Sequence, residues 1–134
     1  MSGKTFADTN ILVYAFSSSE AAKQTKALTV LDECHLVVST QVIREFITVA
    51  TRKYNQPLSK IITHVNHISD ISNIVDENID LIHSALELHK HNNYRFYDCL
   101  IIAAALKADC NVLLSEDMQD GQVIGGLTIV NPFS

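Results

Sequence analysis

The chain has 134 residues, of which 47% are hydrophobic and 19% are charged. This size and composition are typical of one folded domain, expected over residues 1–134, and they exclude a disordered chain or two large domains. The formal net charge is −5, from 10 Lys and Arg against 15 Asp and Glu. That balance disfavours a uniformly basic surface for nucleic acid.

Membrane, secreted and disulfide-stabilised classes are also disfavoured. The longest strongly apolar stretch, residues 99–106, is far shorter than the roughly 18 to 20 residues that cross a bilayer. The first ten residues lack the basic, apolar and small-residue parts of a signal peptide. The chain has three cysteines, an odd number without C-x-x-C spacing, which predicts reduced thiols. We therefore expect a cytoplasmic protein without membrane contact.

The first half of the chain predicts strands alternating with helices. Residues 4–7 form a short run that predicts a strand, and the turn-prone Asp8, Thr9 and Asn10 follow it. Apolar periodicity then predicts a helix over residues 20–32, and the β-branched run at residues 35–39 predicts a second strand. A helix from Thr40 that ends before Asn55 and a helix over 59–71 follow.

The predicted helix that begins at Thr40 carries one wide apolar face. Val42, Phe46 and Val49 belong to this face, and Glu45 lies just off its edge beside Val42 and Val49. A carboxylate at such a position can reach over the rim of a sheet.

The second half continues the alternation. Ile74 and Val75 suggest a weak third strand, and a helix is expected from Asn78 to about residue 91. Residues 97–106 are apolar nearly all round, as in a helix packed centrally against a sheet, with Asp98 in the first turn. Residues 111–114 and 127–130 predict the last two strands, the first of which is followed by Ser115, Glu116 and Asp117.

This alternation predicts an α/β fold with a mainly parallel sheet. Such sheets bind ligands outside the carboxyl ends of their strands. Asp8 and Asp117 both follow predicted strands, so both are placed where a site would form.

Four acids, Asp8, Glu45, Asp98 and Asp117, could form one site. Neighbouring carboxylates repel each other and are stable only with cations or trapped protons. Mg²⁺ and Mn²⁺ prefer such oxygen ligands, and the same ions assist phosphodiester cleavage. Without these four acids, 10 basic residues stand against 11 acidic ones, so the excess negative charge would be concentrated at one metal-binding site.

Each acid also has an ordinary structural explanation. Asp8 or Asp117 could be a turn or cap residue, and Asp98 could simply favour its helix N-terminus. Glu45 could be a solvated helix residue that pairs with a nearby basic side chain. The joint placement of all four favours a site.

Four sequence segments resemble the acidic motifs of the PIN-domain family, in order and over nearly the whole chain. These are Phe6–Leu12, Ser39–Phe46 with Glu45, Tyr97–Ala105 with Asp98, and Leu113–Asp117. Within that family the chain is most similar to toxins of the VapC type. The resemblance implies a PIN-like three-layer α/β/α fold around a mainly parallel, five-stranded sheet. It also implies a Mg²⁺- or Mn²⁺-dependent endoribonuclease that cleaves RNA and is silenced by a cognate antitoxin protein. A homodimer is expected as well.

The resemblance carries over to individual residues of this chain. It makes Asp8, Glu45, Asp98 and Asp117 both the catalytic and the metal-binding residues. Thr9 or Asn10 would help to orient Asp8, and Ser115 would be a hydroxyl residue near the last acid. Asp120 could be an additional acid, although the segment after Asp117 does not decide its role.

Two other functions remain open at this stage. The chain could be a PIN-like module that binds RNA or a protein without cleaving, or a solitary nuclease in RNA processing. A phosphotransferase of the haloacid-dehalogenase kind is disfavoured, because its second acid would fall on Asn10. The RNA target, the number of metal ions and the identity of the antitoxin are not encoded in any short motif.

Overall fold

A computed structural model describes residues 3–134 of the chain. The strands are β1 (Lys4–Ala7), β2 (His35–Ser39), β3 (Asn73–Val75), β4 (Val112–Leu114), β5 (Val123–Ile124) and β6 (Leu127–Val130). The helices are α1 (Thr9–Phe16), α2 (Ala21–Asp32), α3 (Thr40–Arg52), α4 (Leu58–Ile71), α5 (Ile79–His91) and α6 (Phe96–Lys107). None of the helices in this described part is long and apolar enough to cross a membrane.

The strands form one sheet in the order β3-β2-β1-β4-β6-β5. All neighbouring pairs are parallel except β5 and β6. The predicted mainly parallel α/β fold is thus confirmed, but the expected number of five strands is wrong. The strand that was not expected is β5. It forms a hairpin with β6 through Gly125 and Gly126, whose φ angles are +56° and +86°. Two glycines at positive φ allow the tight turn that joins such strands.

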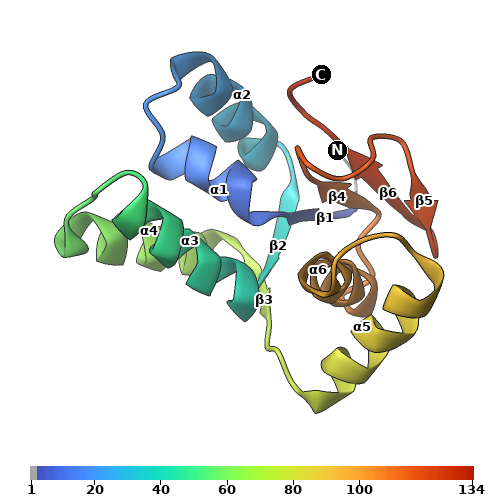
Figure 1. The fold of residues 1–134 in the computed structure, drawn as a ribbon. Helices are drawn as coiled ribbons and strands as arrows, with labels where there is room; N and C mark the ends of the chain where they lie inside the picture. Colours follow the sequence, from blue (N-terminus) through green and yellow to red (C-terminus); the bar gives the residue numbers. More distant parts are fainter. Residues whose placement is uncertain (1–2) are drawn as a thin grey trace.

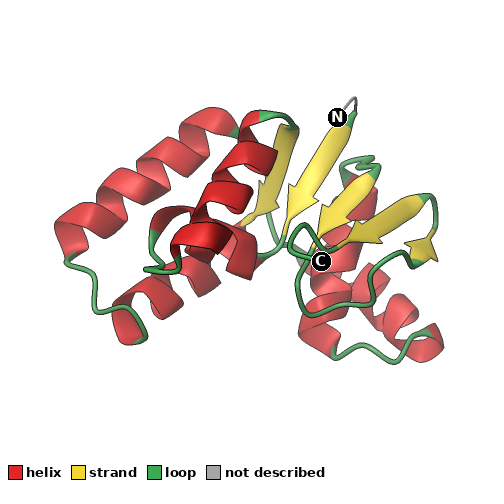
Figure 2. Cartoon of the chain, turned by 90° about the horizontal axis from the view of Figure 1, so that it is seen from above, coloured by secondary structure: helices red, strands yellow, loops and turns green. Residues whose placement is uncertain are grey.

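Helices cover both faces of the sheet and complete the three layers. Helices α1 to α4 gather on one side of the strands, and α5 and α6 lie together on the other (Figures 1 and 2). Helix α6 packs centrally, and every residue from Cys99 to Ala105 is buried. This explains why its sequence is apolar nearly all round, as expected from the sequence.

Helix α1 corrects the interpretation of Asp8, Thr9 and Asn10 as a turn. Asp8 is the N-cap of α1, and Thr9 and Asn10 form the first helical turn. Aspartate is favoured both in turns and at helix N-caps, so the residue type alone does not separate the two. The buried side chains of Ile11 and Leu12 pack this helix against the core.

The chain order places a crevice beside β1. From β1 the chain continues to β2 and β3 on one side, and it then returns to form β4 on the other side of β1. Ala7 pairs with Leu114 at the ends of β1 and β4, so Asp8 and Ser115 leave adjacent strands at the same level. A reversal of strand order is where open parallel sheets bind their ligands.

Candidate functional site

Asp8 lines this crevice and lies between the end of β1 and the start of α1. Its Oδ1 accepts a hydrogen bond of 2.6 Å from the backbone N–H of Thr9, and its Oδ2 accepts one of 3.0 Å from the Ser115 hydroxyl. Burial raises the pKa of the Asp8 carboxyl from 3.8 to about 6, and the negative charges of Asp98 and Glu45 add to this effect. The two hydrogen bonds oppose the rise without cancelling it. The surroundings of Asp8 therefore favour the protonated form of its carboxyl.

Glu45 extends from α3 towards Asp8 and is held by two donors. Its Oε2 accepts a hydrogen bond of 2.8 Å from the Thr9 hydroxyl, and its Oε1 accepts one of 3.0 Å from the side-chain amide of Gln41. The same Gln41 amide donates to the backbone carbonyl of Tyr97 at 3.2 Å. These bonds fix the Glu45 carboxylate between α1 and α6.

Asp98 occupies the first turn of α6 and is half-buried. Burial raises the pKa of its carboxyl, and the charges of Asp117 and Glu45 raise it further, while Arg95 lowers it. The guanidinium Nε of Arg95 lies 3.7 Å from Asp98 Oδ2, and the Arg95 side chain is 87% exposed. Arg95 thus neutralises the acids only partly and remains accessible from solvent.

Asp117 follows β4 and is the most exposed of the four acids. Its Oδ2 accepts a hydrogen bond of 3.0 Å from the side-chain amide of Asn10. Thr9 or Asn10 was expected to help orient Asp8, and of these two residues Asn10 contacts Asp117. Thr9 contacts two acids, with its backbone on Asp8 and its hydroxyl on Glu45.

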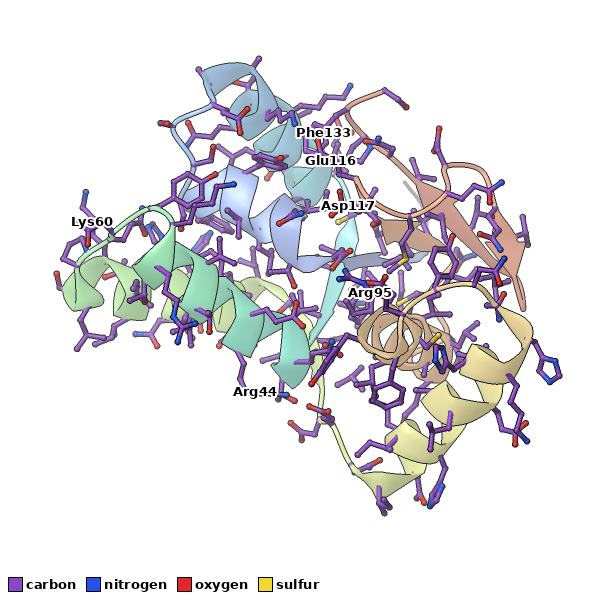
Figure 3. All side chains as sticks on the ribbon, viewed as in Figure 1. Arg44, Lys60, Arg95, Glu116, Asp117 and Phe133 are labelled. Carbon is purple, nitrogen blue, oxygen red and sulfur yellow. The ribbon has the colours of Figure 1, made fainter. Side chains whose placement is uncertain are left out.

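The four acids line a single pocket of about 280 Å³. They come from the ends of β1 and β4, from α3 and from the start of α6, and Arg95 lines the same pocket. Figure 3 shows Asp117 and Arg95 near one another between α1 and α6. The structure therefore brings together side chains that are up to 109 residues apart in sequence, from Asp8 to Asp117.

Asp120 does not join this group of acids. Its Oδ1 accepts a hydrogen bond of 2.8 Å from the backbone N–H of Asn131, and its Oδ2 accepts one of 3.4 Å from the Ser134 hydroxyl. It therefore holds the C-terminal segment, and it is not among the residues that line the acidic pocket.

The donor set of the pocket fits a hard divalent cation. All four acids present carboxylate oxygens, the ligands that Mg²⁺ and Mn²⁺ prefer. Burial chiefly, and neighbouring acids to a smaller extent, raise the pKa values of Asp8 and Asp98. A bound cation would favour the ionised form of both carboxyls. Within residues 3–134, however, no three His, Cys, Asp or Glu side chains are gathered closely enough to form a ready-made metal site.

Two sets of supporting residues were not identified from the sequence. Gln41 is buried and stands one helical turn before Glu45, which is a spacing that could have suggested the contact. Glu116, beside Asp117, accepts hydrogen bonds from Tyr14 at 2.7 Å and from Lys23 at 2.5 Å. This second contact joins residues of α1, α2 and the segment after β4, and no local pattern in the sequence signals it.

A family comparison agrees with the geometry. The model of the PIN domain matches residues 5–119. The chain belongs to the PIN domain family. That match contains all four acids of the pocket, and it confirms the resemblance seen in the sequence motifs. No curated protein matches the sequence.

Several solved structures have a similar fold. A toxin-antitoxin complex from Klebsiella pneumoniae is 22% identical with a TM-score of 0.71, and the match covers 96% of this chain and 97% of that one. VapC20 of Mycobacterium tuberculosis, described as a toxin that cleaves the sarcin-ricin loop, is 18% identical with a TM-score of 0.67 over 81% and 86% of the chains. VapBC2 from Rickettsia felis, bound to a promoter DNA fragment, is 17% identical with a TM-score of 0.64 over 94% and 96%. These proteins share the fold of this chain.

Proposed function

We propose that this PIN domain is a divalent-metal-dependent endoribonuclease and acts as the toxin of a toxin-antitoxin pair. The observation that carries the proposal is the convergence of Asp8, Glu45, Asp98 and Asp117 on one pocket at the switch point of the sheet. The family match and the toxins among the similar structures support it.

Each side chain of the pocket has a part in this proposal. Asp8, Glu45, Asp98 and Asp117 would hold Mg²⁺ or Mn²⁺, which when bound lowers the pKa of water and neutralises phosphate charge. Thr9 and Gln41 keep the Glu45 carboxylate in place, and Ser115 does the same for Asp8. The exposed Arg95 guanidinium can donate to a phosphate of the RNA strand.

A nuclease assay with one matched pair of variants tests the proposal. Purified protein is incubated with single-stranded RNA in Mg²⁺, in Mn²⁺ and in EDTA. We expect cleavage only with metal, and a loss of about 100-fold or more in Asp98→Asn. Asp70→Asn, which changes an exposed aspartate of α4, should cleave like the original protein. Equal cleavage by both variants would remove the site assignment.

The assay also separates the alternative functions. A folded protein that binds RNA but never cleaves it under any metal condition would be a non-cleaving PIN-like module. A protein that cleaves but has no inhibitory partner would be a solitary RNA-processing nuclease.

The antitoxin is proposed as a partner that covers apolar surface and reaches the acids. Ile47 on α3 is 37% exposed, and Leu58 and Ile62 on α4 are 71% and 50% exposed. An amphipathic helix could cover such side chains, and a basic residue beside it could pair with the pocket carboxylates. Co-expression with any small reading frame found next to the gene, followed by an RNA-cleavage assay, tests this. A co-purified complex with full nuclease activity would contradict inhibition at the pocket.

A further inference from the structure

A second cleft opens directly beside the acidic pocket. It has a volume of about 490 Å³, which is in the range of small-ligand sites. One wall runs from His91, the last residue of α5, to Tyr94 in the segment before α6. The other wall contains Gln119 and Gln122 from the segment after β4. Asp117 lines both this cleft and the acidic pocket, so the two are adjacent.

The side chains of this cleft are mostly neutral hydrogen-bonding groups. Four of them are amides, from Asn92, Asn93, Gln119 and Gln122. Asn93 and Gln119 are exposed, and no hydrogen bond to either side chain is formed within residues 3–134. Their donors and acceptors are therefore available to a ligand. Amide side chains offer a donor and an acceptor together, which matches the edge of a nucleobase.

Tyr94 gives the cleft a fixed aromatic wall. Its hydroxyl donates to Gln122 Oε1 and accepts a hydrogen bond of 3.1 Å from the backbone N–H of Gln119. Because Gln122 uses its carbonyl oxygen in this contact, its amide nitrogen is available as a donor. Tyr94 thus joins the two walls, and an aromatic ring that is held in place offers a stacking surface for an unpaired base.

The same segment between α5 and α6 also reaches the acidic pocket. Asn92, Asn93 and Tyr94 line the cleft, and Arg95, the next residue, lines the acidic pocket. An RNA strand whose phosphate lies between Arg95 and the acids would place a neighbouring base towards the cleft.

We propose that this amide-lined cleft beside Asp117 binds one unpaired nucleobase of the RNA strand next to the phosphate held in the acidic pocket. The inference rests on the proposed ribonuclease function and adds the part of the site that recognises the base. Neutral amides and an aromatic ring suit a base, whereas a phosphate or an acidic peptide would need cations that the cleft lacks.

Binding of nucleotides without cleavage tests this inference. AMP, CMP, GMP and UMP are titrated into the full chain with Ca²⁺ present, and backbone amide shifts are followed by NMR. Ribose 5-phosphate is the control ligand, because it carries the phosphate without the base. We expect at least one nucleotide to bind about five-fold or more tightly than ribose 5-phosphate, with shifts in residues 91–94 and 118–122.

The double variant Asn93→Ala/Gln119→Ala should remove most of that difference and leave ribose 5-phosphate binding unchanged. Asn66→Ala on α4, an exposed asparagine far from the cleft residues in sequence, is the matched control and should bind like the original chain. Equal binding of all nucleotides and ribose 5-phosphate would overturn the inference, as would a base preference that persists in the double variant. If the double variant weakens only the binding of a protein partner, the cleft is a protein site and the inference is wrong.

The base-binding cleft and the nuclease function can be rejected independently of each other. If the protein binds nucleotides in a base-dependent way but never cleaves RNA, base binding in the cleft is supported and the nuclease function is rejected. If the protein cleaves RNA with metal but the double variant leaves the base preference unchanged, the nuclease function is supported and base binding in the cleft is rejected.

Discussion

The Asp8 carboxyl has the largest pKa shift among the pocket acids, and its direction determines how stability depends on pH. Its pKa is raised from 3.8 to about 6 in the folded chain, chiefly by burial. The folded state therefore holds the proton more tightly than the unfolded chain does. This stabilisation is complete below about pH 4 and is lost as pH rises to about 6. Above that range, the ionised carboxylate destabilises the metal-free protein.

Asp8→Asn should therefore raise the free energy of unfolding of the metal-free protein at pH 7.5. We expect a gain of about 1 to 3 kcal/mol, because asparagine avoids the buried charge and still caps a helix. Urea unfolding in EDTA measures it, with Asp70→Asn as the exposed control. A gain in both variants, or a loss in Asp8→Asn, would contradict the assigned environment of Asp8.

Metal affinity should show the opposite dependence on pH. A carboxylate must lose its proton to bind Mg²⁺ or Mn²⁺, so affinity should fall about ten-fold for each pH unit below about 6. Calorimetric titration with Mn²⁺ between about pH 5 and about pH 8 measures how metal affinity depends on pH. Affinity that stays constant through pH 6 would show that Asp8 is not a ligand.

Between elements, Thr9 connects the first turn of α1 to Glu45 of α3. Thr9→Val keeps the branched shape and removes the hydroxyl, so Glu45 loses one of its two donors. We expect metal affinity to fall by about ten-fold, as for other outer partners of metal ligands. Thr9→Ser restores the hydroxyl and should recover most of the affinity. If Thr9→Ser is as weak as Thr9→Val, packing rather than the hydrogen bond explains the effect.

A second connection between elements holds the segment after β4. Lys23 lies over the Tyr14 ring at 4.6 Å, and both residues bind Glu116. The Phe133 ring packs edge-on against Tyr14 with centroids 5.1 Å apart. Burial would raise the pKa of Glu116, but the bonds from Lys23 and Tyr14 lower it below its usual value. This cluster therefore fixes the residue that precedes Asp117.

Glu116→Gln should lower the free energy of unfolding by about 1 kcal/mol, because charge-assisted bonds become neutral ones. Glu87→Gln is the matched control, since the Lys90–Glu87 pair is 3.1 Å long with side chains 66% and 68% exposed. Such an exposed pair contributes little to stability. Equal destabilisation by the two variants would contradict a special role for the Glu116 cluster.

At the scale of the whole molecule, the homodimer stays a prediction. The apolar groove of about 720 Å³ between α5 and α6 and the exposed side chains Ile79 and Leu86 offer surface for association. Two-fold dimers are the commonest oligomers. Light scattering over a range of concentrations should give about twice the monomer mass of 14.9 kDa. A particle of monomer mass at every concentration would contradict the prediction.

Much of the fold follows from local patterns. Helical periodicity and β-branched runs predicted all helices but α1 and all strands but β5. The missed strand had a local signal, two glycines between Val123–Ile124 and Leu127. The missed helix had one too, because apolar residues follow a capping aspartate, but the same residues are also typical of a turn.

The amino-acid sequence by itself determined the alternation of strands and helices, the mainly parallel sheet and the local positions of the four acids. Asp8 and Asp117 follow strands, Asp98 begins a helix, and Glu45 lies within one. The individual elements depend on local periodicity and capping, and the parallel sheet follows from their alternating order. The catalytic role of the acids stays a prediction. Only the tertiary structure decided that Asn10 contacts Asp117, that Asp120 turns away to the C-terminal segment, and that Gln41 also reaches the Tyr97 carbonyl. Those contacts join distant segments, and their geometry depends on how the whole chain packs around β1.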